Sequence, residues 1–319
     1  MINIFTEENE QTVYLICKWL ESKSEDYNLI FPDSIDFNVF VSKKKKAFAK
    51  GLTWSDFGSD LFWYRRGALN LIAGLVENSD LDQLEKSHAI IEYDTLEYYL
   101  NWLIKSGRNF GTFGNAELNR LQTFDIAMDN KLQTPNYIVT NSKSDVWDFM
   151  RIHQKIIVKS IANGMFELHG SHLYTTLTKL FSQNDFKKLP DKFFPSLFVE
   201  YINKDFEIRI FYLAGSFYSC AIMSQANKRT KLDFRNYDLE NPNRYAPYKI
   251  PRFLETKLKK IINYFQLKTC SIDMIVRDTG EYIFLEINPV GQFTFIGHPC
   301  NYYLEKELAD QLIISKFIR

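Results

Sequence analysis

Apolar and polar positions along the first hundred residues follow two different periods. Residues 2–5, 37–41 and 61–64 are short apolar or alternating runs of the kind found in strands. Residues 13–20 instead place Val, Ile, Cys and Leu at helical spacing, and residues 88–104 predict a longer helix. This order of strands and helices predicts an N-terminal α/β unit.

The pattern changes near residues 106–116, where Ser and Gly interrupt it and indicate the end of this unit. After that point we expect, in order, a helix at 118–130, a strand at 137–140, a helix at 144–153 and a strand at 155–161. Farther along, strands joined by tight turns are expected at 197–202, 205–213, 217–224, 271–276 and 281–287, with helices at 252–265 and 303–317. The chain is therefore of the mixed α/β (α+β) class, with expected parts at 1–113, 114–196 and 197–319.

The composition removes several classes of function. In 319 residues, 39 Lys and Arg balance 39 Asp and Glu, so no net charge attracts nucleic acid or a membrane surface. No apolar run approaches the ~20 residues that span a bilayer. The N-terminus has neither the basic region nor the cleavage site of a signal peptide. The four cysteines lie far apart without a C-x-x-C pair, which favours free thiols in a reducing cytoplasm.

Two strands near the C-terminal end hold the sharpest candidate for a reactive site. Successive side chains of a strand point to opposite faces, so Glu286 and Asn288 are expected on the same face. Leu285 and Ile287 are expected on the other face. If the hairpin closes through a two-residue turn, Asp273 lies opposite Glu286, whereas a bulge at the turn shifts this pairing by one residue.

Two carboxylates and an amide oxygen would then converge on one patch. Such hard oxygen ligands suit Mg²⁺, which takes its remaining ligands from water and phosphate. The alternative is a solvent-facing polar stripe on a half-buried sheet. Asn288 is followed by Pro289 and then by Gly291-Gln292, which makes a rigid strand end and favours the metal site.

A second group of charges lies on the strand at 205–213. Glu207 and Arg209 share a face there, and such a pair can hold a ribose hydroxyl and a phosphate oxygen, respectively. A surface ion pair is the alternative. Lys159 lies in an apolar strand, where it is costly to bury without an anionic partner such as a phosphate. Its alternative is a strand lysine whose ammonium group reaches water.

Several motifs follow one another in a fixed order along the chain. They are Lys159, residues 200–202 and 207–209, Asp233–Arg235, Asp273 and the run from Phe284 to Phe293. Trp63–Arg66 is a further motif upstream, and Asn119–Pro135 is a further stretch. Together they resemble the ATP-grasp ligases, and within them the macrocycle-forming ligases of graspetides, of the microviridin, plesiocin and grasp-with-spasm types. This chain departs from the family at Gly67, where Pro is usual, and at Arg120, where Lys is common.

The resemblance implies an ATP-grasp fold, in which a pre-ATP-grasp domain precedes two antiparallel sheets that hold the nucleotide between them. It also implies ATP and Mg²⁺ as cofactors. For the nucleotide, the resemblance implies phosphate contacts for Arg120 and Lys159, adenine contacts for Glu200, Tyr201 and Ile202, and a ribose contact for Glu207. For the metal, it implies Mg²⁺ ligation by Asp273, Glu286 and Asn288. For the reaction, it implies that Arg209 contacts the γ-phosphate and the acyl phosphate, and that Arg235 contacts a phosphate or a peptide carboxylate.

The implied partner is a ribosomally made precursor peptide with a helical leader and a core of acidic and hydroxyl side chains. A core Glu or Asp side chain is activated as an acyl phosphate and joined to a Ser or Thr hydroxyl or a Lys amine, which closes an ω-ester or ω-amide macrocycle. Two alternatives stay open: a ligase that adds a free amino acid to a protein or small acceptor, like the ribosomal-protein glutamate ligases, and a peptide-binding module without catalysis. The resemblance also implies a homodimer.

Three segments have expected roles beside the nucleotide site. Trp63–Arg66 is expected to line the interface with the ATP-binding region, where Arg65 or Arg66 reaches the substrate. Residues 165–178 are expected to form a hairpin that binds the leader, with an ordinary loop as the alternative. Residues 164–170 are the candidate lid, because an acyl phosphate must be protected from water.

Overall fold

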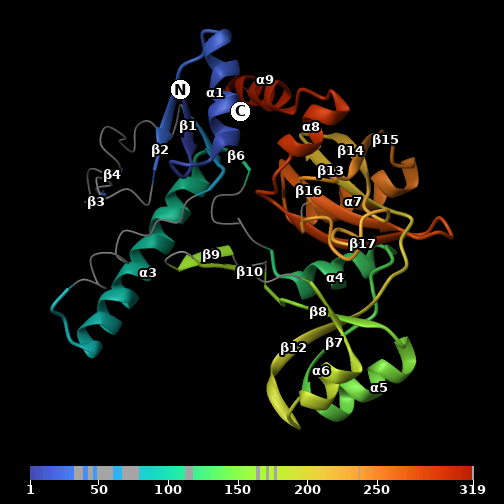
Figure 1. Cartoon of the computed structure of the whole chain (residues 1–319). Coiled ribbons are helices and arrows are strands. Elements are labelled where there is room, and N and C mark those ends of the chain that lie inside the picture. The colour runs from blue at the N-terminus through green and yellow to red at the C-terminus, as the bar shows by residue number, and fades with distance from the viewer. Residues whose placement is uncertain are drawn as a thin grey trace.

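Three sheets organise the molecule (Figure 1). The computed structural model describes residues 1–31, 39–41, 46–48, 60–66, 79–111, 118–162, 166–169, 172–175, 178–236 and 238–317. The N-terminal part lies at the upper left of Figure 1, the central part at the bottom and the C-terminal part at the right. The expected limits of these parts, at residues 113 and 196, stay a prediction.

The N-terminal part is a parallel sheet covered by helices. Its strands lie in the order β2 (Tyr27–Ile30), β1 (Ile2–Phe5), β5 (Leu61–Tyr64) and β6 (Arg108–Phe110). Every residue of β1 is buried, as expected of a central parallel strand with both faces covered. The part also contains α1 (Gln11–Ser22), α3 (Gln83–Ser106) and the paired strands β3 (Val39–Val41) and β4 (Lys46–Phe48). β6 lies in the stretch that the sequence marks only as a boundary.

The central part is an antiparallel sheet with two helices. The strands lie in the order β11 (Lys179–Phe181), β8 (Ile156–Lys159), β12 (Lys192–Glu200) and β7 (Tyr137–Ser142). The helices α5 (Lys143–His153) and α6 (Gln183–Lys188) pack on it through a small apolar core. The hairpin of β9 (Phe166–His169) and β10 (His172–Thr175) confirms the one expected within residues 165–178. β12 begins at Lys192 rather than at the expected residue 197, and a register shift separates its early part from the rest.

The C-terminal part is an antiparallel sheet in the order β15 (Arg244–Tyr248), β14 (Ser216–Met223), β13 (Phe206–Leu213), β16 (Thr269–Val276) and β17 (Tyr282–Asn288). One face packs on α4 (Arg120–Asp129) and α7 (Arg252–Tyr264), in a core that includes Ile208 and Ile210. Because strand side chains alternate, Glu207 and Arg209 face the opposite side, as predicted. The part of that side around Glu207 faces the central sheet, whereas Phe211 and Leu213 farther along β13 pack on the N-terminal part and the last two helices.

The last two helices connect the C-terminal sheet to the N-terminal part. They are α8 (Thr294–Cys300) and α9 (Leu304–Phe317), and α9 lies against α1 (Figure 1). Leu308 and Leu312 of α9 are buried in one core with Ile16 of α1. Just before α8, Phe293 stacks on Phe211 of β13 with ring centroids 4.2 Å apart, in that same core. The first and last segments of the chain therefore share a core with side chains of β13 and β14 in the C-terminal sheet.

The turn between β16 and β17 decides which side chains face the central sheet. It closes through residues 278–280, and Gly280 has a φ of 85°, a left-handed conformation that favours glycine. A bulge at Leu285 then adds one residue to β17, so that Asp273 lies opposite Glu286, as predicted. The bulge also brings Leu285 to the same side as Glu286. The expectation that Leu285 and Glu286 face opposite sides is therefore wrong.

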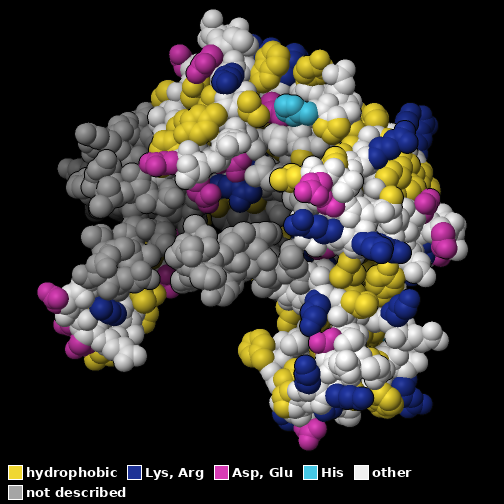
Figure 2. Space-filling view, in the orientation of Figure 1, with side chains coloured by type: hydrophobic (Ala, Val, Ile, Leu, Met, Phe, Trp, Pro, Cys, Tyr) yellow, Lys and Arg dark blue, Asp and Glu magenta, His cyan; other side chains and the backbone are white. Residues whose placement is uncertain are grey.

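The surface in Figure 2 intersperses basic, acidic and apolar side chains over the central and C-terminal parts. None of the helices in the described ranges is long and apolar enough to cross a membrane.

Candidate active site

A cavity lies between the central and C-terminal sheets and is lined by side chains of both. Apolar side chains from both sheets and α4 form part of its wall: Phe124, Ile157, Val199, Ile202, Ile275 and Leu285. Charged side chains form another part: Lys159, Glu200, Lys204, Glu207, Asp233, Arg235, Asp273 and Glu286. The expected pair of antiparallel sheets therefore encloses a cavity with an apolar side and a charged side.

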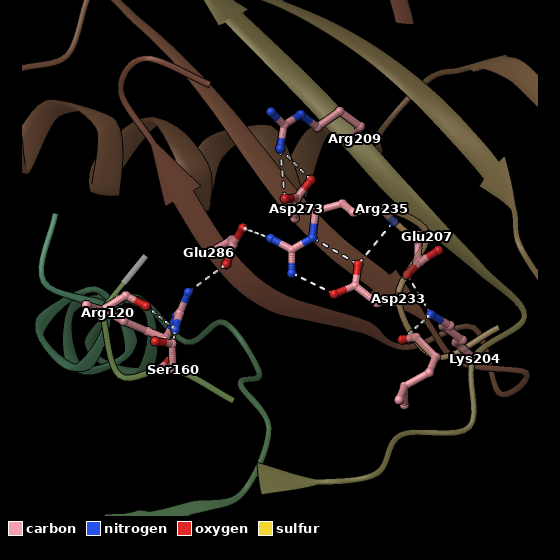
Figure 3. A network of polar contacts seen from close by, with 11 residues as sticks. Arg120, Ser160, Lys204, Glu207, Arg209, Asp233, Arg235, Asp273 and Glu286 are labelled. Atoms are coloured by element: carbon pink, nitrogen blue, oxygen red, sulfur yellow. Dashed lines mark hydrogen bonds and ion pairs between the residues drawn. The ribbon is translucent and has the colours of Figure 1, made fainter. Parts of the chain in front are cut away.

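Two carboxylates on adjacent strands, Asp273 and Glu286, are held by arginines at the charged side (Figure 3). Arg209 of β13 donates from Nη1 to both oxygens of Asp273, at 2.7 and 2.8 Å. Arg120, at the start of α4, donates from Nη2 to Glu286 at 3.1 Å. Arg235 Nη1 lies 3.6 Å from the same carboxylate. Segments that are distant in the sequence thus meet around two carboxylates.

Arg120 also connects α4 to the chain that follows β8. Its Nη1 donates to the main-chain carbonyls of Ser160 and Ala162, the second at 3.0 Å, and the residue is only 6% exposed. These contacts place the guanidinium beside Lys159, the last residue of β8. Both cations predicted to contact phosphate therefore lie near Glu286, and Lys159 lines the cavity.

The charges shift one another's pKa values. Burial alone would raise the pKa of Glu286, but the surrounding cations, Lys159 foremost, lower it to about 2. Burial raises the pKa of Asp273, although Arg209 opposes this rise. Burial lowers the pKa of Lys159 to about 8, and Glu286 limits that fall. An ionised carboxylate thus stands among several buried cations, an environment that favours an additional anion such as a phosphate.

Arg235 and Asp233 form a two-bonded ion pair on the cavity wall. Arg235 donates from Nε and Nη2 to the two oxygens of Asp233, at 2.9 and 2.8 Å. Burial would lower the pKa of the Arg235 guanidinium, but Asp233 outweighs it and raises this pKa. The Arg235 side chain is 36% exposed, so a guanidinium of fixed charge and orientation faces the opening of the site.

Glu207 does not pair with Arg209, its neighbour on the same face. It accepts from Lys204 Nζ at 2.5 Å and from Ser224 Oγ at 2.7 Å. Lys204 also donates to the main-chain carbonyl of Leu232 at 3.2 Å, and burial raises the pKa of Glu207. Lys204 was not among the residues expected at the site, because it precedes β13 in a loop where the pattern of apolar positions does not distinguish buried from exposed residues.

The residues expected to contact adenine lie at the end of β12, on the rim of the cavity: Glu200, Tyr201 and Ile202. Glu200 accepts from the main-chain and side-chain N–H groups of Asn136 at 3.1 and 3.2 Å. It also accepts from Arg277 Nη2 at 3.3 Å. The Glu200 carboxylate thus has partners within the protein, and its contact with adenine stays a prediction.

Asn288, the third expected metal ligand, turns its amide oxygen toward the main chain, where it accepts from the N–H of Val290 at 3.0 Å. In the described part of the chain, no group of three or more His, Cys, Asp or Glu side chains could hold a metal ion. Mg²⁺ needs only one or two carboxylates when phosphates and water supply the other oxygens. Asp273 and Glu286 therefore fit its donor preference together with a phosphate-bearing ligand.

The N-terminal part reaches this site through Arg65, which follows β5. Its side chain is 4% exposed and donates from Nη1 to the carbonyl of Val290 at 2.8 Å. Its Nη2 donates to the side chain of Gln292 at 3.0 Å, and Arg66 pairs with Glu10. The predicted position of this motif at the interface is confirmed, whereas contact of either arginine with a substrate stays a prediction.

No protein-family model matches the sequence, and no curated protein matches it either. Solved structures, in contrast, match nearly the whole chain. Macrocyclase MdnC bound with precursor peptide MdnA, from Microcystis aeruginosa MRC, has a TM-score of 0.79 and 23% identity, covering 99% of this chain and 100% of that chain. A RiPP-associated ATP-grasp ligase from Chryseobacterium gregarium, in complex with ADP and a leader and core peptide, has a TM-score of 0.80 and 20% identity, covering 98% and 96%.

The ATP-grasp ligase PsnB, complexed with a phosphomimetic variant of its minimal precursor, Mg and ADP, has a TM-score of 0.70 and 14% identity, covering 98% of each chain. At these identities the likeness establishes the fold. The chain has the ATP-grasp fold, as the order of its motifs predicted.

Proposed function

We propose that this protein is an ADP-forming ATP-grasp ligase that joins Glu or Asp side chains of a precursor peptide to Ser or Thr hydroxyls or Lys amines. The observation that carries this proposal is the acidic pair Asp273 and Glu286, surrounded by buried cations in a cavity between two antiparallel sheets. Proteins of the same fold that bind precursor peptides, two of them with ADP, support the proposal.

The two sides of the cavity suit the two ends of ATP. Val199, Ile202 and Leu285 offer an apolar wall for the adenine ring, with Tyr201 beside them. Glu207 is the candidate for the ribose hydroxyls, since Lys204 holds its carboxylate in place. At the other side, Arg120 and Lys159 would hold phosphate oxygens, because both are buried cations next to Glu286.

Asp273 and Glu286 would hold Mg²⁺, with Asn288 able to join them if its amide turns away from Val290. Bound Mg²⁺ supplies charge that offsets the phosphate oxygens and orients the γ-phosphate. Arg209 would place its guanidinium beside the transferring phosphoryl group, and Arg235 would bind a phosphate oxygen or the substrate carboxylate.

The reaction proceeds in two transfers. A carboxylate oxygen of the peptide attacks the γ-phosphorus of ATP, the bond from phosphorus to the β-γ bridging oxygen breaks, and ADP leaves. A hydroxyl or amine of the same peptide then attacks the acyl carbon, the bond from this carbon to the phosphate oxygen breaks, and the phosphate leaves with the proton of the nucleophile. Arg209 and Arg235 stabilise the charge of the phosphoryl group in both transfers, and the enclosing sheets exclude water from the acyl phosphate.

The test is the mass of the product. Purified protein is incubated with ATP, Mg²⁺ and an acidic, hydroxyl-rich peptide encoded in a neighbouring reading frame. The proposal predicts ADP release and loss of the mass of one water per link formed. A gain of one amino-acid residue would favour the alternative ligase instead, and no peptide-dependent ADP release would leave only a peptide-binding module.

We propose that the hairpin of β9 and β10 binds the leader of the peptide. We also propose that the protein is a homodimer and that it acts in the cytoplasm. All four cysteines are free and buried, as expected in a reducing compartment. Light scattering of the purified protein tests the dimer, and leader binding to a variant that lacks residues 166–175 tests the hairpin.

A further inference from the structure

Arg209 has two anchors of different kinds. Its Nη1 is bound by the Asp273 carboxylate (Figure 3), and its Nη2 donates to the main-chain carbonyl of Gln292 at 2.8 Å. Under the proposed function Asp273 also binds Mg²⁺, so its oxygens are shared between two cations. The Gln292 carbonyl is not among the expected Mg²⁺ ligands, so its hydrogen bond to Arg209 does not compete with metal binding.

The side chain of Gln292 is held by the N-terminal part. Its Oε1 accepts from Arg65 Nη2 at 3.0 Å and from Thr12 Oγ1 at 2.9 Å. Its Nε2 donates to a Glu10 oxygen at 3.3 Å. Arg65 also donates to the carbonyl of Val290, so the segment 290–292 is held through both its main chain and its side chain.

The other side of this segment packs tightly on the C-terminal sheet. A Cβ atom at Gly291 would lie 2.4 Å from Ser271 Cβ and 2.9 Å from Arg209 Nη2. Ser271 Oγ also donates to the Gln292 carbonyl, at 3.3 Å. The turn therefore has no space in which to shift independently of Arg209.

We propose that Gln292 and Arg65 are positioning residues for Arg209: they hold the Gln292 carbonyl where it orients the Arg209 guanidinium toward the reacting phosphoryl group. The N-terminal part then completes the active site instead of serving only as a separate module. The catalytic consequence rests on the proposed function, whereas the effect on the guanidinium does not.

The first experiment measures the Arg209 guanidinium directly. Gln292→Ala removes the side-chain contacts but keeps the main-chain carbonyl. In protein labelled with ¹⁵N-arginine, and with signals assigned through Arg209→Lys, the exchange of the two Nη groups reports rotation of the guanidinium. Loss of the three side-chain hydrogen bonds that hold this segment predicts about tenfold faster exchange in Gln292→Ala. Exchange equal to that of the wild type overturns the proposal.

The matched control is Gln133→Ala, whose side chain contacts Glu281 near the β16–β17 turn, away from Arg209. We expect no change of Arg209 exchange in this variant. Should Gln292→Ala fail to fold, Thr12→Val removes one donor to Gln292 Oε1 with little change in volume. In Thr12→Val the exchange of the Arg209 Nη groups should be faster than in the wild type, by a smaller factor than in Gln292→Ala. An unchanged exchange rate in Thr12→Val would also overturn the proposal.

The second experiment measures peptide-dependent ADP release. A misplaced catalytic group predicts that kcat of Gln292→Ala falls about 10- to 100-fold, while KM for ATP stays within about twofold. Arg65→Lys keeps the charge but replaces the two nitrogens that bind the Val290 carbonyl and Gln292 Oε1 with a single ammonium group, so its kcat should fall too. Because both changes affect the same contacts, the double variant with Gln292→Ala should have a kcat close to that of the single variants. Normal kcat together with faster guanidinium exchange overturns the catalytic part. If the wild type releases no ADP, the proposed function fails, and the exchange measurement still decides whether these residues hold Arg209.

Discussion

At Glu286, one carboxylate faces Lys159, Arg120 and Arg235 across a buried cavity. Removal of its charge leaves these cations without their nearest counter-ion, and it removes an oxygen donor for Mg²⁺. The unpaired cations destabilise the empty site, and the lost oxygen donor acts against a productive geometry of the bound nucleotide. The same carboxylate therefore serves the stability of the empty site and the chemistry of the filled one.

Glu286→Gln keeps the shape of the side chain and removes its charge, so we expect cross-linking to be abolished while the protein still folds. Breaking a buried ion pair costs about 3 kcal/mol of unfolding free energy, which is less than the roughly 5–15 kcal/mol typical of folded proteins. Arg209→Ala should abolish cross-linking as well. The measurement is product mass, with urea unfolding for stability. Glu281→Gln, on the exposed turn beside β17, is the control, and normal turnover in Glu286→Gln would remove this residue from the mechanism.

The lowered pKa of Lys159, about 8, predicts a pH dependence of ATP binding. A phosphate stabilises the ammonium form, so affinity should be nearly constant below pH 8 and weaken above it, by about tenfold per pH unit. Titration of ATP into the protein at pH 7, 8 and 9 measures this. Lys159→Arg keeps its charge throughout this range and should bind with flat affinity. A flat profile in the wild type would show that Lys159 does not contact phosphate.

Single residues also mark the limit of prediction from sequence. Alternation correctly placed Glu207 and Arg209 on one face of β13, because this property is local. The pairing of Asp273 with Glu286 was expected from a two-residue turn, but the turn has three residues and the bulge at Leu285 restores the pairing. The contact of Arg120 with Glu286 depends on how α4 packs beside β17, which no local pattern encodes. Lys204 is a similar case: its burial follows from the loop that covers it.

At the scale of elements, strong periodic segments were predictable and short or interrupted ones were not. α7, with apolar residues at helical spacing, and β13, with its alternation, appear where expected. β6 has only three residues and depends on pairing with β5. β15 contains Pro247, which an edge strand tolerates, and α8 contains Gly297 and Pro299, which hide its helical pattern. The bulge at Leu285 could not be predicted from the sequence pattern either, because it results from the pairing of β17 with β16.

The turn after β17 gives a prediction at this scale. Gly291→Ala places a Cβ atom 2.4 Å from Ser271 Cβ, so the turn must move and take Arg209 with it. We expect a loss of about 1–3 kcal/mol in unfolding free energy and a strong loss of turnover. Gly297→Ala is the matched control, since its nearest contact, Leu304 Cγ, lies at 3.4 Å and can adjust. Equal turnover of the two variants would contradict this account.

At the scale of the whole molecule, the first and last helices pack on each other. α9 packs on α1 and β1, and the segment between β17 and α8 carries the contacts of Gln292. The sequence predicted a helix in each of these two segments, but it did not predict that they pack together. This contact is a result of tertiary packing, because Ile16 and Leu312 are distant in sequence and share one core. The N-terminal part and the C-terminal sheet should consequently unfold together.

Leu312→Ala tests this coupling. Leu312 is fully buried, and its truncation should lower the unfolding free energy by about 2–5 kcal/mol. Ile314 on the same helix is 49% exposed, so Ile314→Ala should change the unfolding free energy by less than about 0.5 kcal/mol. Hydrogen exchange measured during urea unfolding should show amides of α1 and β16 losing protection in one transition in both variants. If α1 and α9 lose protection at lower urea while β16 stays protected, the N-terminal part is an independent unit, and its contacts with Gln292 cannot be what holds Arg209 in place.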